Sequence, residues 1–172
     1  MAVVDRTSYL KSATTQLPID AVTVAGQGGG ILEIVAKVPI LSTDDADSIY
    51  RFCEVPSNFI PVGGEITCSA ITGANSWDLG IYENPENGGA VIDVDALAAA
   101  IDLSSALAPG SGLSPIVAVA IANQNAAFYT LASDVSGERQ TYTLAFKTNA
   151  DPAADGTIIV RLRLVRREYA AA

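Results

Sequence analysis

The chain of 172 residues contains no histidine, a single tryptophan and only two cysteines. Without histidine, the Ser-His-Asp and Cys-His mechanisms of nucleophilic catalysis and histidine-ligated zinc sites are excluded. No apolar run approaches the roughly 18 residues of a membrane-spanning helix. The N-terminal sequence "MAVVDRTSYLKSATTQ" also lacks the apolar segment of a secretory signal, so we expect neither such a signal nor a membrane partner.

Basic residues are scarce as well. Ten Lys and Arg stand against 19 Asp and Glu, which gives a net charge of −9. An acidic chain gains no counterion-release affinity for nucleic acid, so we expect no nucleic-acid partner. At this length a folded chain buries roughly 70% of the surface that its unfolded form exposes. Because 49% of the residues are apolar, a core can form without metal or disulfides.

The two cysteines, Cys53 and Cys68, are too few for a disulfide scaffold. If residues 47–55 and 65–72 form a hairpin, the two side chains lie opposite each other and can form a bond. The alternative is that both are small buried apolar residues, as most such cysteines are. The sequence leaves both alternatives open.

Alternation of apolar and polar residues predicts most of the fold. We expect strands over residues 31–40, 48–55, 63–72, 77–82, 114–122, 126–132, 140–147 and 157–168. The segment 114–122 is apolar on both faces and is predicted as a central strand. In the last strand two arginines, Arg161 and Arg163, face away from four aliphatic residues: Ile158, Val160, Leu162 and Leu164.

Only residues 94–103, "VDALAAAIDL", resemble a helix, because alanine favours helices and Asp93 or Asp95 can cap the N-terminus. Many short strands with one short helix predict a mainly β fold, an antiparallel, jelly-roll-like β-sandwich. The glycine-rich "AGQGGG" marks a hinge. We therefore expect an extended N-terminal arm with its hinge over residues 1–30 and the sandwich domain over residues 31–172.

The stretch "SWDLGIYENPENGG", residues 76–89, raises three hypotheses. As a strand that leads into a turn, it buries Trp77, Leu79 and Ile81 and leaves Asp78 outside. As a calcium loop it offers several oxygens but not the EF-hand spacing. As a catalytic pair, Asp78 and Glu83 lack a nearby nucleophile. We favour the strand and turn, and expect no catalytic residue, metal, cofactor or small-molecule substrate.

Four arginines near the C-terminus form the one strong charge asymmetry: Arg161, Arg163, Arg166 and Arg167. One interpretation is a solvated face of an edge strand, where charge discourages unwanted pairing. The other is a docking face for an acidic partner. The acidity of the remaining chain makes the second as strong as the first, so these arginines are the candidate partner-contact residues.

Two stretches carry a resemblance to a known family: "ADSIYRFCEVPSNFIPVGGEIT" and "WDLGIYENPENGGAVIDVDALAAAIDLSSA". A strand ends in a proline-containing turn, and a second strand leads to an aromatic–aliphatic strand containing glycine. An Asn/Asp/Gly turn then precedes the expected alanine-rich helix with its aspartate cap. Over roughly residues 45–105 the pattern resembles head decoration (cement) proteins of tailed bacteriophages. It has no catalytic motif, so no residue role is transferred.

The resemblance implies a structural virion protein, made in the host cytoplasm and placed on the capsid exterior. Its expected partner is the major capsid protein, and its expected state is a homotrimer. The alternative function is a tail-fibre, receptor-binding or carbohydrate-binding β-sandwich module. Sugar sites present exposed aromatic platforms, whereas the only tryptophan is predicted to be buried.

Overall fold

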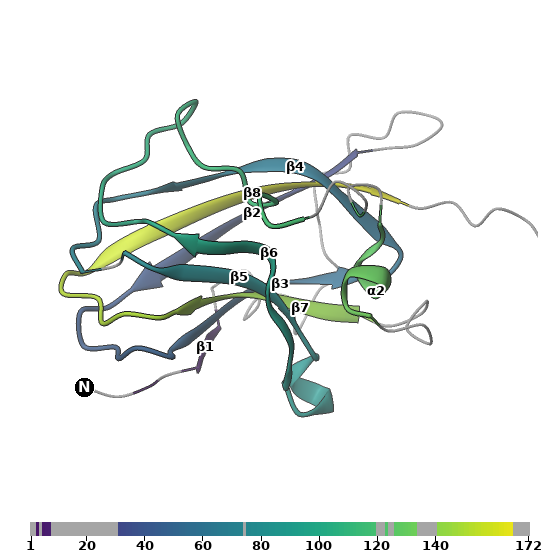
Figure 1. Cartoon of the computed structure of the whole chain (residues 1–172), viewed down its shortest axis with the longest axis horizontal. Coiled ribbons are helices and arrows are strands. Elements are labelled where there is room, and N and C mark those ends of the chain that lie inside the picture. Colours follow the sequence, from purple (N-terminus) through teal and green to yellow (C-terminus); the bar gives the residue numbers. More distant parts are fainter. Residues whose placement is uncertain are drawn as a thin grey trace, which may run out of the picture.

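The computed structural model describes residues 3, 5–7, 31–73, 75–119, 123, 126–133 and 141–166. Two sheets face each other (Figure 1). One has three strands in the order β2-β8-β4 and the other has five in the order β1-β3-β7-β5-β6. The strands are β1 (Asp5–Thr7), β2 (Ile31–Ile40), β3 (Ile49–Pro56), β4 (Phe59–Cys68), β5 (Trp77–Tyr82), β6 (Val91–Ile101), β7 (Thr141–Thr148) and β8 (Gly156–Arg166).

The three-stranded sheet follows the predicted alternation closely. β2 pairs with β8 without interruption from Ile31↔Val165 to Ile40↔Gly156. Every second residue of β8 is buried, from Ile158 to Leu164, and the residues between them are exposed or half-buried. The predicted strands at 31–40 and 157–168 and their apolar faces are therefore confirmed over the described residues.

The five-stranded sheet has β7 at its centre, between β3 and β5. β1 is the one strand of this sheet that pairs in parallel, and it adds to the edge strand β3 through three residue pairs. These three residues are the main described part of the predicted N-terminal arm; the glycine hinge lies outside the described residues. All other strand pairs are antiparallel, so the predicted mainly β, sandwich-like architecture is confirmed.

The core lies between the sheets and is rich in aromatic rings. Trp77 packs against Tyr50 with ring centroids 5.4 Å apart, and Phe52 packs against Phe146 at 5.3 Å. The three inward residues of β5 are fully buried: Trp77, Leu79 and Ile81. Asp78, on the outward side, is half-buried. The predicted inner face of residues 77–82 is thus confirmed.

The helix predicted over 94–103 is wrong, because residues 91–101 form strand β6. Alanine's helix preference amounts to a few tenths of a kcal/mol per residue and is overridden by pairing with a neighbouring strand. β6 pairs with β5 through several bulges, and Ala100 takes a positive φ of 51°. The bulges break the period of two that would have identified a strand.

Two predicted strands are also wrong. Residues 114–119 form turns, with Val117 64% exposed; the rest of the predicted central strand lies outside the described residues. Within 126–132, the short helix α2 (Phe128–Leu131) replaces the predicted strand. It buries Phe128, and Tyr129 donates its backbone N–H to the Ser57 carbonyl at 3.1 Å. Short apolar runs do not distinguish strand, helix and buried turn by pattern alone.

The hairpin of 47–55 and 65–72 does not form either, because β3 and β4 belong to different sheets. Cys53 and Cys68 are not disulfide-bonded, and both are buried, as small apolar residues would be. β4 begins at Phe59, so most of the connection expected over "PSNFIPVGG" is strand. Within the described ranges, no helix has the length and apolar character needed to cross a membrane.

Candidate partner-contact surface

The outward side of the three-stranded sheet combines charged and apolar side chains. Because partners in an antiparallel register point to the same face, each row across the sheet can be read from the pairing. Arg163 lies opposite Glu33, and Arg161 lies between Val35 and Glu65. We call this surface the outer β8 face, and define it by seven residues: Glu33, Val35, Lys37, Glu65, Ile159, Arg161 and Arg163.

The arginines of the outer β8 face are weakly neutralised. Arg163 Nε lies 3.9 Å from Glu33 Oε1, at the long limit of an ion pair, and its side chain is 60% exposed. Glu65 is engaged elsewhere: its Oε1 accepts the backbone N–H groups of Gly110 at 2.6 Å and Gly112 at 3.3 Å. Arg161 is exposed and has no ion pair with another described residue. Both arginines are therefore available to an outside partner.

The structure divides the predicted arginine cluster. Arg161 and Arg163 share the outer β8 face, whereas Arg166 alternates to the other side at the strand end, opposite Phe59. Arg167 lies outside the described residues. The edge-strand interpretation is wrong, because β8 is the central strand of its sheet. Protection of a free edge therefore does not explain these charges.

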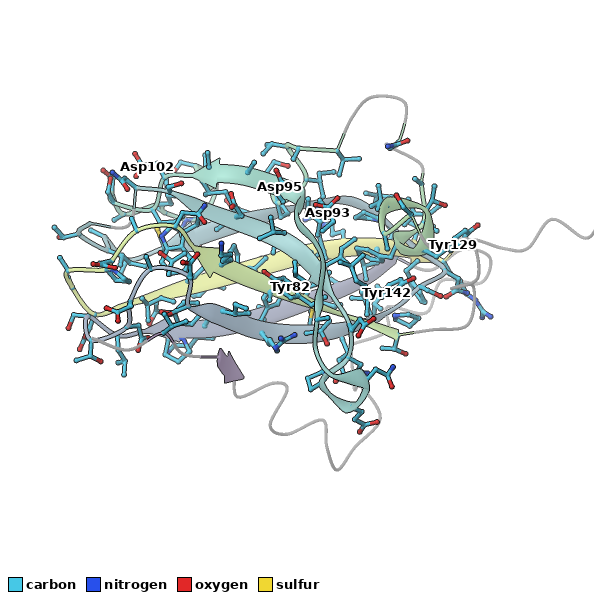
Figure 2. The ribbon with its side chains drawn as sticks, turned by 60° about the horizontal axis from the view of Figure 1, so that its bottom comes forward. Tyr82, Asp93, Asp95, Asp102, Tyr129 and Tyr142 are labelled. Carbon is cyan, nitrogen blue, oxygen red and sulfur yellow. The ribbon has the colours of Figure 1, made fainter. Side chains whose placement is uncertain are left out.

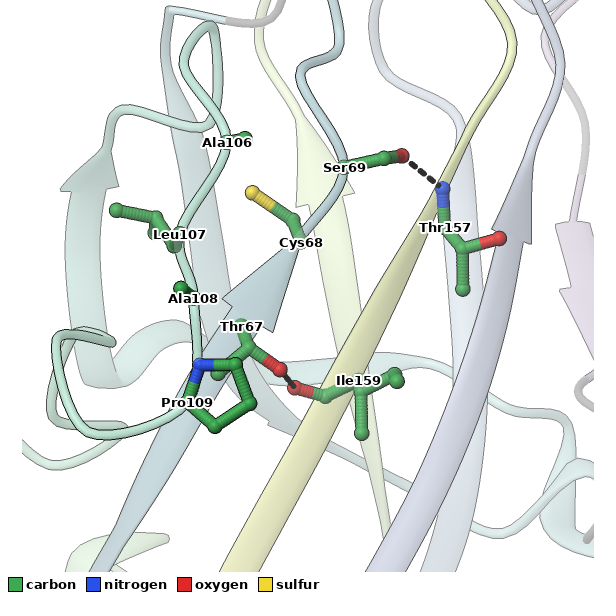
Figure 3. Close-up of a pocket in the computed structure, with 9 residues that line it drawn as sticks. All are labelled: Thr67, Cys68, Ser69, Ala106, Leu107, Ala108, Pro109, Thr157 and Ile159. Atoms are coloured by element: carbon green, nitrogen blue, oxygen red, sulfur yellow. Dashed lines mark hydrogen bonds between the residues drawn. The ribbon is translucent and has the colours of Figure 1, made fainter.

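Apolar residues that the sequence reasoning did not select complete the surface. Val35 is 46% exposed and Ile159 is 37% exposed. Ile159 also lines a groove of about 350 Å³ beside the loop 106–109, together with Thr67 and Pro109 (Figure 3). Ile159 could have been predicted for this surface, because the strict alternation of β8 places it on the same side as Arg161 and Arg163.

Cys68 lines the same groove without giving it reactivity. Its Sγ donates to the Ser105 carbonyl at 3.4 Å. Burial raises the pKa of the Cys68 thiol, with Asp102 adding to the rise. The thiol is therefore protonated at neutral pH, whereas nucleophilic chemistry requires the thiolate.

Two other basic side chains with a described placement are engaged within the molecule. Arg51 is 4% exposed, and Lys147 pairs with Asp47 at 2.8 Å. Lys37, like Arg161, lies on the outer β8 face and has no ion pair with a described residue. Most of the available positive charge of the described side chains thus collects on one face of an acidic protein.

Arg51 shows how differently the five-stranded sheet uses an arginine. Its guanidinium lies over the Tyr82 ring, 5.1 Å from the centroid, and donates to the Gly89 carbonyl at 2.7 Å. In the same row of the sheet stand Ala145 and Gly80, which are small enough to leave room for a side chain lying flat. Nothing in the sequence pattern singled out Arg51.

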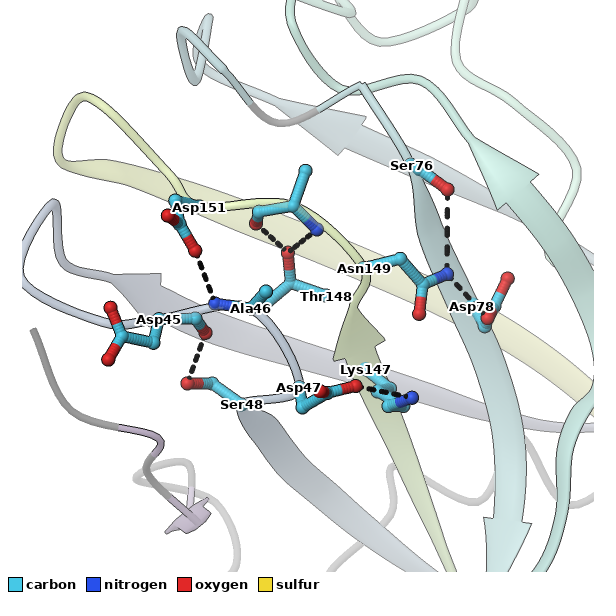
Figure 4. A network of polar contacts seen from close by, with 11 residues as sticks. Asp45, Ala46, Asp47, Ser48, Ser76, Asp78, Lys147, Thr148, Asn149 and Asp151 are labelled. Carbon is cyan, nitrogen blue, oxygen red and sulfur yellow. Dashed lines mark hydrogen bonds and ion pairs between the residues drawn. The ribbon is translucent and has the colours of Figure 1, made fainter.

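Asp78, the residue of the catalytic and metal hypotheses, holds two segments together (Figure 4). Its Oδ1 accepts a hydrogen bond from the Ala100 N–H at 2.9 Å. Its Oδ2 accepts one from Asn149 Nδ2 at 2.7 Å, which Figure 4 draws. Nearby, Asp151 accepts the Ala46 N–H at 2.7 Å. The described residues contain no group of three or more metal-ligating side chains. Asp78 and Asp151 therefore act as hydrogen-bond acceptors that hold loops in place.

The Asn/Gly segment forms the predicted turn. The short 3₁₀ helix η1 (Pro85–Asn87) ends at Gly88, which has a φ of 97°. Glu83 donates its backbone N–H to the Ala90 carbonyl at 2.8 Å and closes the turn. The proline and the glycine each occupy a position that suits their backbone preference. The strand-and-turn interpretation of residues 76–89 is confirmed.

An acidic pair lies on β6, the edge strand of the five-stranded sheet (Figure 2). The Asp95 N–H donates to Asp93 Oδ1 at 3.3 Å, which holds the two residues close together. Burial raises the pKa of Asp93, and the neighbouring Asp95 raises it further. The Asp93 carboxylate is therefore destabilised by its surroundings, and a nearby cation would relieve it.

Comparison with known proteins gives a shared fold. A chain in the solved capsid of Ralstonia phage GP4 superimposes with a TM-score of 0.55 at 18% sequence identity, over 85% of this chain and 91% of that one. A chain in the capsid asymmetric unit of cyanophage Pam1 gives a TM-score of 0.48 at 16% identity, over 89% and 96%. No family model and no curated protein matches. This chain has the fold of the GP4 capsid chain.

Proposed function

We propose that the protein is a structural component of a bacteriophage virion. It decorates the capsid exterior as a homotrimer and binds the lattice of the major capsid protein. The fold shared with a chain of the Ralstonia phage GP4 capsid, over 91% of that chain, carries the proposal. The resemblance of residues 45–105 to head decoration proteins points to the same role.

The outer β8 face supports a binding role over a catalytic one. It offers exposed apolar area beside weakly neutralised arginines, which is the composition of an interface core with a polar rim. Asp78 serves as a loop anchor and Cys68 is held as a protonated thiol. The proposal therefore assigns the protein no enzymatic activity, cofactor or small-molecule substrate.

The carbohydrate-binding and tail-fibre alternative lacks a platform in the described residues. Trp77 is fully buried, and Phe59 and Tyr129, the least buried of the described aromatic side chains, are half-buried. Sugar recognition generally stacks the ligand on an exposed ring, which these residues do not provide. We therefore prefer the capsid role.

Co-sedimentation with capsids tests the proposal. Purified protein is mixed with capsids of the encoding phage from which it has been stripped or genetically deleted. We expect saturable binding with a fixed number of copies per capsid, and much less binding to capsids that already carry the protein. Capsids that bind none of the protein, or virions that contain it only in the tail, would contradict the proposal.

Residues 1–24 are proposed to serve assembly more than folding. Their sequence shows no sustained alternation of apolar and polar residues, and a glycine-rich stretch lies between them and β2. Three of them, in β1, pair with the edge of the five-stranded sheet. Deleting them is expected to leave the sandwich folded, as judged by circular dichroism, and to weaken self-association or capsid binding. An insoluble or unfolded truncation would show instead that the segment, including β1, belongs to the core.

A further inference from the structure

Strand β2 is an edge strand of the three-stranded sheet. Among the described strands its one neighbour is β8, and the two pair over the ten residues of β2 without a bulge. A long, regular edge presents backbone N–H and C=O groups to which another strand can add, and proteins commonly shorten, bulge or cover such edges. β2 keeps its full length and its regular pairing. Its outer edge is therefore a surface on which a further strand can pair.

The hydrogen bonds of β8 determine which β2 residues direct their backbone groups to this edge. The Thr157 carbonyl points towards β4, because it accepts the Ser69 N–H at 3.1 Å. The Ile159 carbonyl points the same way and accepts Thr67 Oγ1 at 3.5 Å. The even-numbered residues of β8 therefore bond to the even-numbered residues of β2 opposite them. The odd-numbered residues of β2, from 31 to 39, direct their backbone groups to the open edge.

The sequence of β2 is complementary to itself about Val35. In "EIVAK", Glu33 and Lys37 stand at equal distances on either side of Val35. When two copies of the strand run antiparallel with Val35 opposite Val35, Glu33 of each copy lies opposite Lys37 of the other. All three residues belong to the odd-numbered set, so each of these pairs can exchange two backbone hydrogen bonds across the edge.

We propose that the β2 edge binds the β2 edge of a second copy, antiparallel and centred on Val35. The two three-stranded sheets then form one six-stranded sheet in the order β4-β8-β2-β2-β8-β4. The occupant of the edge is thus another copy of this chain. The inference goes beyond the proposed function, because it assigns a contact between copies that does not involve the capsid.

The side chains of β2 on the outer β8 face favour this pairing. Lys37 has no ion pair with another described residue. Glu33 is weakly paired, with its Oε1 3.9 Å from Arg163 Nε. In the joined sheets, Glu33 lies between Arg163 of its own copy and Lys37 of the second copy, so the charges alternate along the row. At the centre, the two Val35 side chains, each 46% exposed, cover each other and remove apolar area from water.

Charge also selects the register. A shift of four residues in either direction brings Glu33 opposite Glu33, or Lys37 opposite Lys37, and like charges in opposed positions are destabilising. Lysine and proline on an edge strand discourage unwanted pairing. In the centred register, however, Lys37 meets a carboxylate, and Pro39 lies opposite Ile31, whose N–H its carbonyl can accept. Both residues are therefore compatible with this register.

The contact has two-fold symmetry, because the same surface of each copy meets itself. A two-fold contact joins two copies and does not close a ring of three. In the proposed homotrimer it would therefore link copies that belong to two neighbouring trimers, and the contact within a trimer would lie elsewhere. In solution we expect monomers to pair into dimers, or trimers to pair into hexamers.

Cysteine cross-linking tests the register in the full chain without capsids. Hydrogen-bonded antiparallel partners have Cα atoms about 5.5 Å apart, which suits a disulfide. Under mild oxidation we expect V35C to become largely a disulfide-linked dimer on a non-reducing gel. K37C is the matched control, because its two copies lie roughly 13 Å apart along the strand. K37C alone should stay unlinked, whereas a mixture of K37C and E33C should link. Cys53 and Cys68 are buried and add little background.

Charge reversal tests the side-chain pairs. K37E places carboxylates opposite each other at both ends of the contact, so we expect the dissociation constant to rise about tenfold or more in sedimentation velocity across a concentration series. E33K should have the same effect. A one-to-one mixture of K37E and E33K restores opposite charges and should recover most of the association. Arg166→Glu makes the same charge change as K37E off the β2 edge and should stay within about twofold of wild type. Circular dichroism checks folding.

Two results would overturn the proposal: V35C that cross-links no more than K37C, or a mixture of K37E and E33K that associates no better than either variant alone. If these variants weaken capsid co-sedimentation while V35C stays unlinked, the edge binds the capsid protein and the occupant is wrong. Cross-linking and sedimentation are measured without capsids, so failure of this contact is separable from failure of the capsid role.

Discussion

The outward faces of the two sheets differ more than their sequences suggest. On the three-stranded sheet the residues between the core positions of β8 are exposed or half-buried. On the five-stranded sheet four outward residues near the centre are almost fully buried: Arg51 at 4%, Tyr82 at 1%, and Thr143 and Ala145 at 0%. Asp78 and Lys147, farther along the same face, are half-buried. One face is part of the folded interior and the other is a surface, although an arginine occupies a central position on each.

The contrast teaches that the neighbours of an arginine decide its role. Arg51 has Ala145 and Gly80 in its row and can lie flat across the sheet. Arg161 has Val35 and Glu65 in its row, and Glu65 is turned to the loop 110–112. A long side chain with small neighbours can lie flat on the sheet and be buried there. A long side chain whose neighbours are larger, or are hydrogen-bonded elsewhere, extends into solvent.

Replacing Trp77 with alanine is expected to have the largest effect and sets the scale for the comparison. Trp77 lies between the sheets, fully buried against Tyr50. Its truncation leaves a large cavity and should cost about 3–5 kcal/mol of unfolding free energy. Chemical denaturation followed by circular dichroism measures it. An unchanged denaturation midpoint would contradict the placement of Trp77.

Replacing Arg51 with alanine comes next, with Arg161→Ala as its counterpart on the other sheet. Arg51 loses a charge-assisted hydrogen bond and a cation–π contact, so we expect a cost of about 2–4 kcal/mol. Arg161→Ala should stay within about 0.5 kcal/mol, because it removes an exposed side chain. Equal effects on the unfolding free energy would remove the distinction between the two faces.

Enlarging Ala145 sharpens the same contrast. Ala145→Leu forces extra volume into the fully buried row beneath Arg51 and should cost about 1–3 kcal/mol. Its counterpart, Ile159→Ala on the outer β8 face, removes a partly exposed side chain and should cost clearly less. Melting temperatures of the two variants at a protein concentration too low for self-association test this order. The reverse order would mean that the outer β8 face is the better packed of the two.

The smallest expected effect concerns the Asp93 carboxylate. Its pKa is raised in the folded protein, so the folded state disfavours the charged form. Stability linked to this group is therefore complete at low pH and is lost as pH rises through the folded pKa. Asp93→Asn should raise the melting temperature slightly at pH 7, and the gain should vanish in acid. The opposite pH trend would show that Asp93 is stabilised as an anion.

Much of the fold followed from the sequence where the sheet alternates strictly. β2, β5, β7 and β8 were predicted with their inward faces, because each buries one face against the core. β6 was missed because its bulges interrupt the alternation and alanine suggested a helix. α2 and the turns at 114–119 were predicted as strands because both segments are apolar. Their apolar residues show no helical or strand periodicity, so the sequence pattern does not identify the structure that they form.

The candidate surface was predicted in part. Arg161 and Arg163 follow directly from alternation, whereas the central position of β8 depends on which strands flank it. That information comes from long-range pairing and is not contained in the strand itself. The engagement of Glu65 with a loop more than 40 residues away is of the same kind. Local pattern identified the charges, and topology determined that they are available.

A cryo-electron microscopy reconstruction of the encoding phage's capsid, with and without this protein, tests the account most directly. The account predicts difference density on the outer surface of the shell that fits trimers of the β-sandwich. Density absent from the shell exterior, or sandwiches whose outer β8 face remains bare, would contradict the account.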